Sequence, residues 1–142
     1  MSARDALVRE ARAWIGTPYQ HQASLMGVGC DCLGLVRGVW RACIGPEPER
    51  APPYASDWAE ATRRERLAEA GLKYFTPIDI AAFAAGDVLL FRWRENLPAK
   101  HLAIATSTTT MVHAHDGACV AEVAIALFWR RRLAYAFAFP RS

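Results

Sequence analysis

The chain of 142 residues is 53% hydrophobic and 22% charged, which is typical of a soluble globular protein and excludes an intrinsically disordered chain. This length supports one hydrophobic core, so we assign residues 1–142 to a single domain. The net charge of +3 is too small to predict a nucleic-acid partner, and no hydrophobic run reaches the ~20 residues of a membrane span.

The first residues of the chain do not resemble a secretory signal. Residues 1–14 contain charges throughout, whereas a secretory signal needs a continuous apolar stretch. We therefore expect the chain to be made in the cytoplasm. The basic run at residues 129–132 stands alone, and we interpret it as the solvated end of a strand.

Helices are predicted in the first half of the chain. Ser2 and Asp5 cap the first helix, which ends at residues 16–18 and in which Leu7, Ala11, Trp14 and Ile15 recur at helical spacing. Residues 19–29 lack a sustained period and read as a loop. A second helix begins at Cys32 with Asp31 as its N-cap, and its hydrophobic stripe consists of Leu35, Val36, Val39, Trp40 and Cys43.

A charged third helix is predicted at residues 58–70, with Asp57 as its N-cap and Gly71 as its C-cap. It is separated from the second helix by a proline-rich crossing that begins at Gly45. We expect this helix to pair Glu60 with Arg64 and to have a structural role.

Short β-type segments follow residue 86, at residues 88–93, 101–107, 110–114, 119–123 and 133–139. Helices followed by strands indicate an α+β fold, with N-terminal helices packed on a C-terminal antiparallel sheet. We also expect a hairpin through residues 106–110, which places polar residues of its two strands opposite one another.

The cysteines are candidates for chemistry. The chain has four of them, Cys30, Cys32, Cys43 and Cys119, and a disulfide framework is not expected without an export signal. A structural zinc site is an open alternative, since Cys30 and Cys32 could combine with His101, His113 or His115. Its spacing is unusual, because the helix directs the Cys32 side chain toward the core.

A nucleophilic cysteine explains more of the pattern. Cys32 lies in the first turn of a helix, where unpaired N–H groups stabilise a thiolate and lower its pKa. Such a cysteine needs a histidine as base and a third polar group that orients the ring. His21 lies in the loop before the helix, and three histidines lie on strands: His101, and the pair His113 and His115, whose side chains share one face. Each histidine taken alone is equally compatible with an ordinary half-buried strand residue.

Several segments, in the same order, resemble the NlpC-type cell-wall cysteine peptidases. DCLGLV at residues 31–36 is similar to the family's D-C-x-G-L/F-V signature, and GTPY at 16–19 to its G-x-P-Y segment. AGDVLLF at 85–91 resembles its P-G-D-L-v-F-F strand, HLAI at 101–104 its H-v-G/A-I segment, and MVHA at 111–114 its f-I-H-A segment.

The resemblance implies a circularly rearranged papain-like fold and a thiol hydrolase without metal or other cofactor. Residue by residue, it makes Cys32 the nucleophile, His101 the base, His113 the orienting residue and Tyr19 a polar group beside the nucleophile. We place Tyr19 and Asp31 in the substrate and oxyanion region, with backbone N–H groups at the helix start holding the oxyanion. Cys30 is expected to pack in the interior, and His115 to lie outside the triad.

The resemblance implies that the substrate is peptidoglycan, cleaved at amide bonds of the stem peptides. By analogy with the family, the bond is the one that joins D-γ-glutamate to diaminopimelate. Two departures concern the substrate groove: residues 20–22 are QHQ where the family has a tryptophan-glycine stretch, and Leu33 replaces the commoner serine.

GCDCLGLV in a short chain resembles most the phage-type branch, found in tail gene clusters of phages and gene transfer agents. We therefore expect a virion or phage-like tail component that acts in the recipient periplasm, with tail-tip or baseplate hub proteins as partners. The lack of a recognisable signal and wall-binding module agrees with this expectation. The alternatives are an amidase or acyltransferase of the same fold with another substrate, a catalytically silent tail component, and a zinc-binding module.

Overall fold

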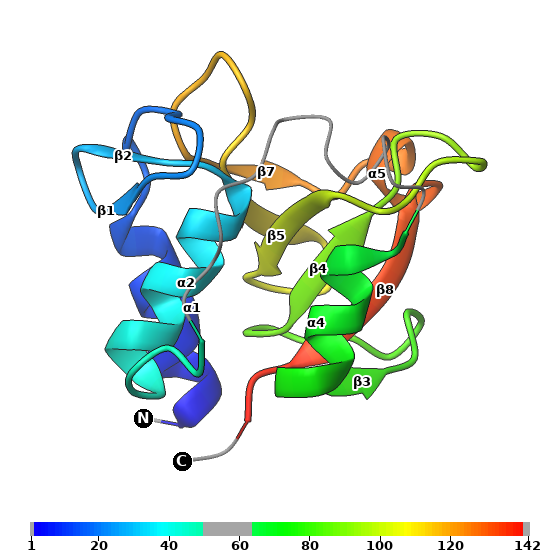
Figure 1. Ribbon diagram of the computed structural model, residues 1–142, viewed down its shortest axis with the longest axis horizontal. Helices are drawn as coiled ribbons and strands as arrows, with labels where there is room; N and C mark the ends of the chain where they lie inside the picture. Colours follow the sequence, from blue (N-terminus) through cyan, green and yellow to red (C-terminus); the bar gives the residue numbers. More distant parts are fainter. Residues whose placement is uncertain (1, 50–63, 141–142) are drawn as a thin grey trace.

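The computed structural model describes residues 2–49 and 64–140 of the chain and has the α+β architecture that the sequence predicts (Figure 1). Its helices are α1 (Ala3–Ala13), α2 (Cys32–Cys43), α4 (Arg66–Tyr74) and the short α5 (Leu127–Arg130). Its strands are β1 (Ser24–Leu25), β2 (Gly29–Cys30), β3 (Thr76–Ile78), β4 (Val88–Phe91), β5 (His101–Ala105), β6 (Thr110–His113), β7 (Ala121–Ala124) and β8 (Leu133–Ala138).

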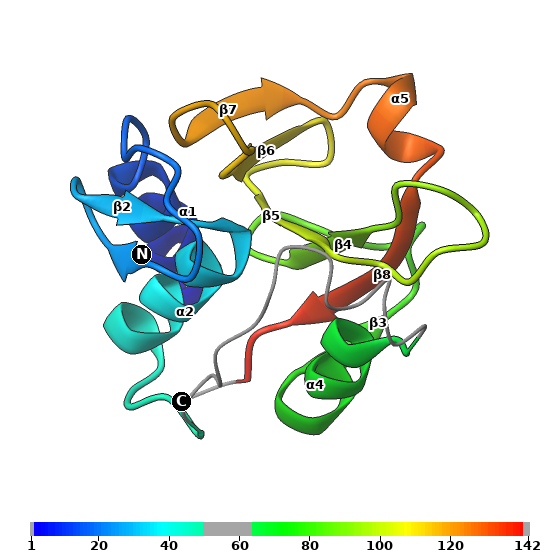
Figure 2. The same ribbon diagram turned by 45° about the horizontal axis from the view of Figure 1, so that its top comes forward.

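The main sheet has six antiparallel strands in the order β3-β8-β4-β5-β6-β7. α1 and α2 lie side by side on one side of the sheet, and both views show α4 beside β3 and β8 (Figures 1 and 2). The predicted hairpin between β5 and β6 is confirmed, and its last paired residues toward the start of β5 are Ala103 and His113. No helix in the described ranges has both the length and the hydrophobicity to cross a bilayer.

The first helix begins as the sequence predicts. The Ser2 hydroxyl accepts a hydrogen bond from Asp5 N, and the Asp5 carboxylate accepts one from Ser2 N, each 3.1 Å long. α1 then packs closely on α2, because a Cβ at Gly38 would lie 2.0 Å from Cζ2 of Trp14. The absence of a side chain at this position therefore sets the distance between the two helices.

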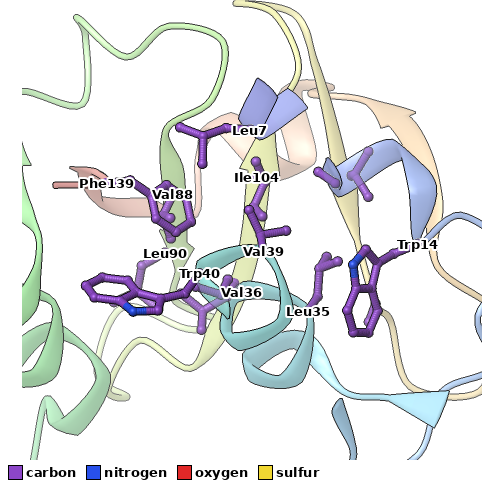
Figure 3. Close-up of a cluster of buried hydrophobic side chains, with 14 of the residues drawn as sticks. Leu7, Trp14, Leu35, Val36, Val39, Trp40, Val88, Leu90, Ile104 and Phe139 are labelled. Carbon is purple, nitrogen blue, oxygen red and sulfur yellow. The ribbon is translucent and has the colours of Figure 1, made fainter. Parts of the chain in front are cut away.

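Hydrophobic side chains fill both faces of the sheet. The larger cluster joins the helices to one face and includes Leu7, Leu35, Val39, Val88 and Ile104 (Figure 3). A smaller cluster on the other face includes Leu89, Phe91, Ala103 and Met111. Since side chains alternate along a strand, His101 shares this second face with Ala103.

Two of the predicted elements are wrong. α4 begins at Arg66, with Glu65 as its N-cap, and ends at Tyr74. Gly71 therefore lies inside the helix, where the Phe137 ring approaches to 2.5 Å from the place that a Cβ would take. Its predicted N-cap, Asp57, and Glu60 lie outside the described residues. The basic run is not a strand end, because Trp129 and Arg130 belong to α5 and β8 begins only at Leu133. β3 and α5 were not predicted, and neither were the short strands β1 and β2, which the assignment of residues 19–29 to a loop left out.

Candidate active site

Asp31 anchors the start of α2, as predicted. Its carboxylate is 3% exposed and accepts two backbone hydrogen bonds of 2.7 Å, from Gly34 N within the helix and from Gln22 N in the preceding loop. Gly34 is needed at this position, since a Cβ there would lie 1.9 Å from the carbonyl oxygen of Ala23. The loop and the first turn of the helix are therefore held against each other, and this fixes the position of Cys32.

Cys32 is the first residue of α2 and touches the start of β5. Its Sγ donates a hydrogen bond to the carbonyl of Lys100 at 3.6 Å, and the N–H of Leu102 also interacts with the sulfur. These backbone groups flank His101, so the sulfur lies next to the backbone of that histidine. Within residues 2–49 and 64–140, no hydrogen bond joins the sulfur to the His101 ring itself.

The thiol of Cys32 differs from the expected helix-start thiolate. Burial raises its pKa to about 12, and the negative charge of Asp31 adds to this rise. The N–H groups of Leu102, Leu33 and Cys32 lower the pKa, but burial outweighs them. The sulfur therefore carries its proton in the resting site, and it must lose that proton during any attack.

His101 and His113 form the hydrogen-bonded pair that the hairpin predicts. Nε2 of His101 lies 2.8 Å from Nδ1 of His113, and each residue is 5% exposed. Burial lowers the pKa of His101 well below its ordinary value and lowers that of His113 to about 4. Both rings are therefore neutral at pH 7. When Nε2 of His101 carries the proton of this bond, its Nδ1 has the free lone pair that can accept a further proton.

Aromatic rings surround the histidine pair. Trp129 stacks on His101 with ring centroids 5.2 Å apart at 23°, and it meets the His113 ring edge-on at 5.3 Å. Trp93 approaches His101 to 5.2 Å. Neither tryptophan was predicted to belong to the site, because Trp93 lies just beyond the 85–91 segment and residue 129 was assigned to a strand end.

Tyr19 lies beside Cys32, as expected. Burial, together with the smaller effects of the neighbouring Cys32 and Asp31, raises the pKa of its hydroxyl to about 12. The backbone on either side of Tyr19 bonds to Cys30: Cys30 N donates to Pro18 O at 3.1 Å, and Gln20 N donates to Cys30 O at 3.0 Å. The GTPY and GCDC segments are therefore neighbours in space.

Cys30 and His115 have different surroundings from the residues above. Cys30 is fully buried in the larger hydrophobic cluster, and burial raises its pKa to about 11, in agreement with a packing role. His115 is half-buried, with its ring 5.6 Å from that of His101, and its Nδ1 lies 3.2 Å from the carbonyl of Asp116.

The described part of the chain contains no group of residues arranged to bind the zinc ion of the alternative hypothesis. All four cysteines are free, and none of the described histidines, cysteines, aspartates and glutamates form a group of three or more that could hold a metal ion.

The arrangement resembles solved structures of one family. The NlpC/p60 domain of the peptidoglycan hydrolase SagA superposes with a TM-score of 0.67 over 96% of this chain and 98% of its own, at 24% identity. This chain has the NlpC/P60 fold. An NlpC/P60 family protein from Bacillus cereus gives a TM-score of 0.70 at 18% identity, and a lipoprotein-like NLP/P60 protein from Staphylococcus aureus gives 0.66 at 19%.

The chain covers 40% of the Bacillus cereus protein and 42% of the Staphylococcus aureus protein, so those chains are more than twice as long. No family model and no curated protein matches the sequence. The superposed structures nevertheless share the fold that the motifs imply. These motifs lie at residues 16–19, 31–36, 85–91, 101–104 and 111–114.

Proposed function

We propose that the protein is a cysteine peptidase that hydrolyses amide bonds in peptidoglycan stem peptides, with Cys32 as nucleophile, His101 as base and His113 as orienting residue. The observation that carries the proposal is the buried His101–His113 hydrogen bond of 2.8 Å, next to a helix-start cysteine that contacts the backbone on both sides of His101. This pair leaves Nδ1 of His101 available to the thiol.

The first step follows from the protonation states. The thiol is protonated and His101 is neutral, so proton transfer from Sγ to Nδ1 accompanies attack of the sulfur on the substrate carbonyl. The sulfur gives up its bond to the Lys100 carbonyl in this step. The N–H groups of Cys32 and Leu33 at the helix start, which already stabilise negative charge at the sulfur, hold the oxyanion.

The second half of the reaction returns the proton. His101 protonates the leaving amine as the carbon–nitrogen bond breaks, and an acyl-thioester remains on Cys32. A water molecule that gives its proton to His101 then attacks the thioester, which releases the carboxylic acid and restores the thiol. His113 holds the His101 ring through both steps, and Tyr19 lines the groove beside the sulfur.

The substrate class rests on the motifs and on the fold shared with SagA, which is described as a peptidoglycan hydrolase. Within the stem peptide, we propose the bond between D-γ-glutamate and diaminopimelate, because the motifs resemble those of peptidases with that preference. The QHQ segment at residues 20–22 and Leu33 lie where the groove departs from the family pattern.

Delivery by a phage-like tail is a further part of the proposal, supported by the resemblance of GCDCLGLV to the phage-type branch. The protein then binds tail-tip or baseplate hub proteins and acts in the periplasm of the recipient cell. Proteomics of purified particles tests this part by itself, and absence of the protein from the particles would refute it.

The test of the activity is digestion of purified sacculi followed by mass spectrometry of the released muropeptides. We expect new free termini with the wild type and none with Cys32→Ala, while Cys119→Ser serves as a control because Cys119 is exposed and has no part in the proposed reaction. Products from wild type and Cys32→Ala alike would refute the proposal. Activity only on small amides would favour the amidase or acyltransferase alternative, and no turnover at all would favour a silent tail component.

The two histidines should differ in their contribution. His101→Ala removes the proton carrier and should lower kcat/KM by about a thousandfold or more, whereas His113→Ala removes an orienting group and should cost less. Near-wild-type rates for both variants would refute the assignment of the triad.

A further inference from the structure

An arginine-rich pocket lies beside the histidine pair. It is lined by residues 92–95, after β4, and by residues 131–135, at the start of β8. The two segments meet because Arg92 N donates to Arg132 O at 2.8 Å, next to the paired strand ends (Figure 1). Four arginines and a single acidic residue, Glu95, line this pocket, so its walls are strongly positive.

Part of this positive charge has no acidic partner. Arg92 forms an ion pair with Glu65, at 2.7 Å, and so is neutralised. Arg132 is held in place by stacking on the Phe128 ring and by a 2.9 Å hydrogen bond to the Phe128 carbonyl, contacts that do not cancel its charge. Among residues 2–49 and 64–140, no carboxylate forms an ion pair with Arg94, Arg131 or Arg132.

Guanidinium groups bind carboxylates through paired, charge-assisted hydrogen bonds, so a carboxylate is the ligand that these arginines favour. The pocket opens next to the base of the proposed reaction, since Trp93 both lines the pocket and packs against His101 with ring centroids 5.2 Å apart. A substrate that reaches His101 can therefore extend one of its groups past Trp93 to the arginines.

The role of His101 identifies which half of the substrate reaches the arginines. His101 protonates the leaving amine, so the residue that supplies this amine lies on the His101 side of the sulfur. We propose that the arginine pocket, residues 92–95 and 131–135, binds a side-chain carboxylate on that amine-side residue. The inference rests on the proposed function and names its specificity: diaminopimelate carries such a carboxylate at the end of its side chain, whereas lysine does not.

The test compares two synthetic peptides that differ only in the amine-side residue of a D-γ-glutamyl bond, diaminopimelate in one and lysine in the other. Wild type should hydrolyse the diaminopimelate peptide with at least tenfold higher kcat/KM. Arg94→Gln and Arg131→Gln should each reduce this preference several-fold and leave kcat/KM for the lysine peptide unchanged.

Arg130→Gln is the matched control. Arg130 belongs to the same basic run but lies outside the pocket, and its guanidinium donates to the Thr108 carbonyl at 2.8 Å. This variant should keep the wild-type preference. Equal hydrolysis of the two peptides by wild type, or a loss in the pocket variants that is the same for both peptides, would overturn the inference.

Failure of the proposed function is distinguishable from failure of this inference. If wild type cleaves neither peptide, the peptidase proposal is refuted, and the pocket is judged by calorimetric binding of the two peptides to Cys32→Ala protein. Tighter binding of the diaminopimelate peptide that Arg131→Gln abolishes would support the pocket. Equal binding of both peptides, with or without Arg131, would overturn it.

Discussion

Replacing Asp31 with asparagine perturbs two properties of the site in opposite ways. The carboxylate uses one oxygen for Gly34 N and the other for Gln22 N, both at 2.7 Å, and it is 3% exposed. An asparagine keeps a single oxygen and turns its NH₂ toward one of these N–H groups. One buried donor is therefore left facing another donor, while the negative charge next to Cys32 disappears.

The loss of stability can be estimated from these contacts. Asparagine is as good an N-cap as aspartate, so we expect the bond to Gly34 N to survive and the bond to Gln22 N to be lost. A hydrogen bond to a charged group contributes about 1.5–3 kcal/mol, and a buried N–H without an acceptor costs a similar amount. We expect a decrease of about 3 kcal/mol in the free energy of unfolding, which lowers Tm by about 10 °C in a chain of this size.

The effect on Cys32 has the opposite sense. The charge of Asp31 raises the pKa of the Cys32 thiol, in addition to the larger effect of burial. Asp31→Asn should therefore lower this pKa, so that iodoacetamide modifies Cys32 at lower pH than in the wild type. The variant should be less stable and more reactive at the same time.

Urea unfolding measures the first effect, and the pH dependence of alkylation, followed by peptide mapping in a Cys119→Ser background, measures the second. Asp79→Asn is the control, because Asp79 also accepts a backbone bond, from Ala81 N at 2.8 Å, but in an exposed turn. Unchanged stability would show that the two bonds do not hold the helix start. An alkylation midpoint that stays the same or rises would show that Asp31 does not act on the thiol.

Three further predictions concern the packing around the site. Trp129→Ala should admit water to His101, raise the pKa of its ring, move the acid limb of the pH–rate profile to higher pH and lower kcat about tenfold. Leu127→Ala, which alters an exposed side chain of the same short helix, should change none of these. The free energy of unfolding should fall as pH drops from about 6.5 to 4. In this range His113 binds a proton in the unfolded chain but not in the fold, where its pKa is about 4. A His113→Gln variant whose urea unfolding has the same pH slope would contradict this. Gly38→Ala should destabilise the fold by about 1–3 kcal/mol, because its Cβ would lie 2.0 Å from Trp14 Cζ2. In an exposed helix the same substitution raises Tm, and a gain in Tm here would show that α1 and α2 can move apart.

The sequence by itself determined those features that depend on neighbouring residues. The capping box of Ser2 and Asp5, the N-cap at Asp31 and the start of α2 at Cys32 all lie where helix-capping chemistry predicts them. The short connection between β5 and β6 predicted their hairpin, and the resemblance of residues 101–104 and 111–114 to the family's segments paired His101 with His113. Each of these features involves groups a few residues apart or joined by one hairpin.

The tertiary structure alone decided the features that depend on residues far apart in the chain. Helix-start chemistry by itself predicted a thiolate at Cys32, but in the fold the sulfur contacts Lys100 and Leu102 at the start of β5, and burial raises its pKa. Gly71 lies inside α4 and does not end it, because the residue is needed there for the Phe137 ring, which occupies the space that a side chain would fill. Trp129 lies 28 residues after His101, and stacking between them requires both the sheet and α5. Burial and long-range contact come from the packed fold, and a local pattern of residues does not contain them.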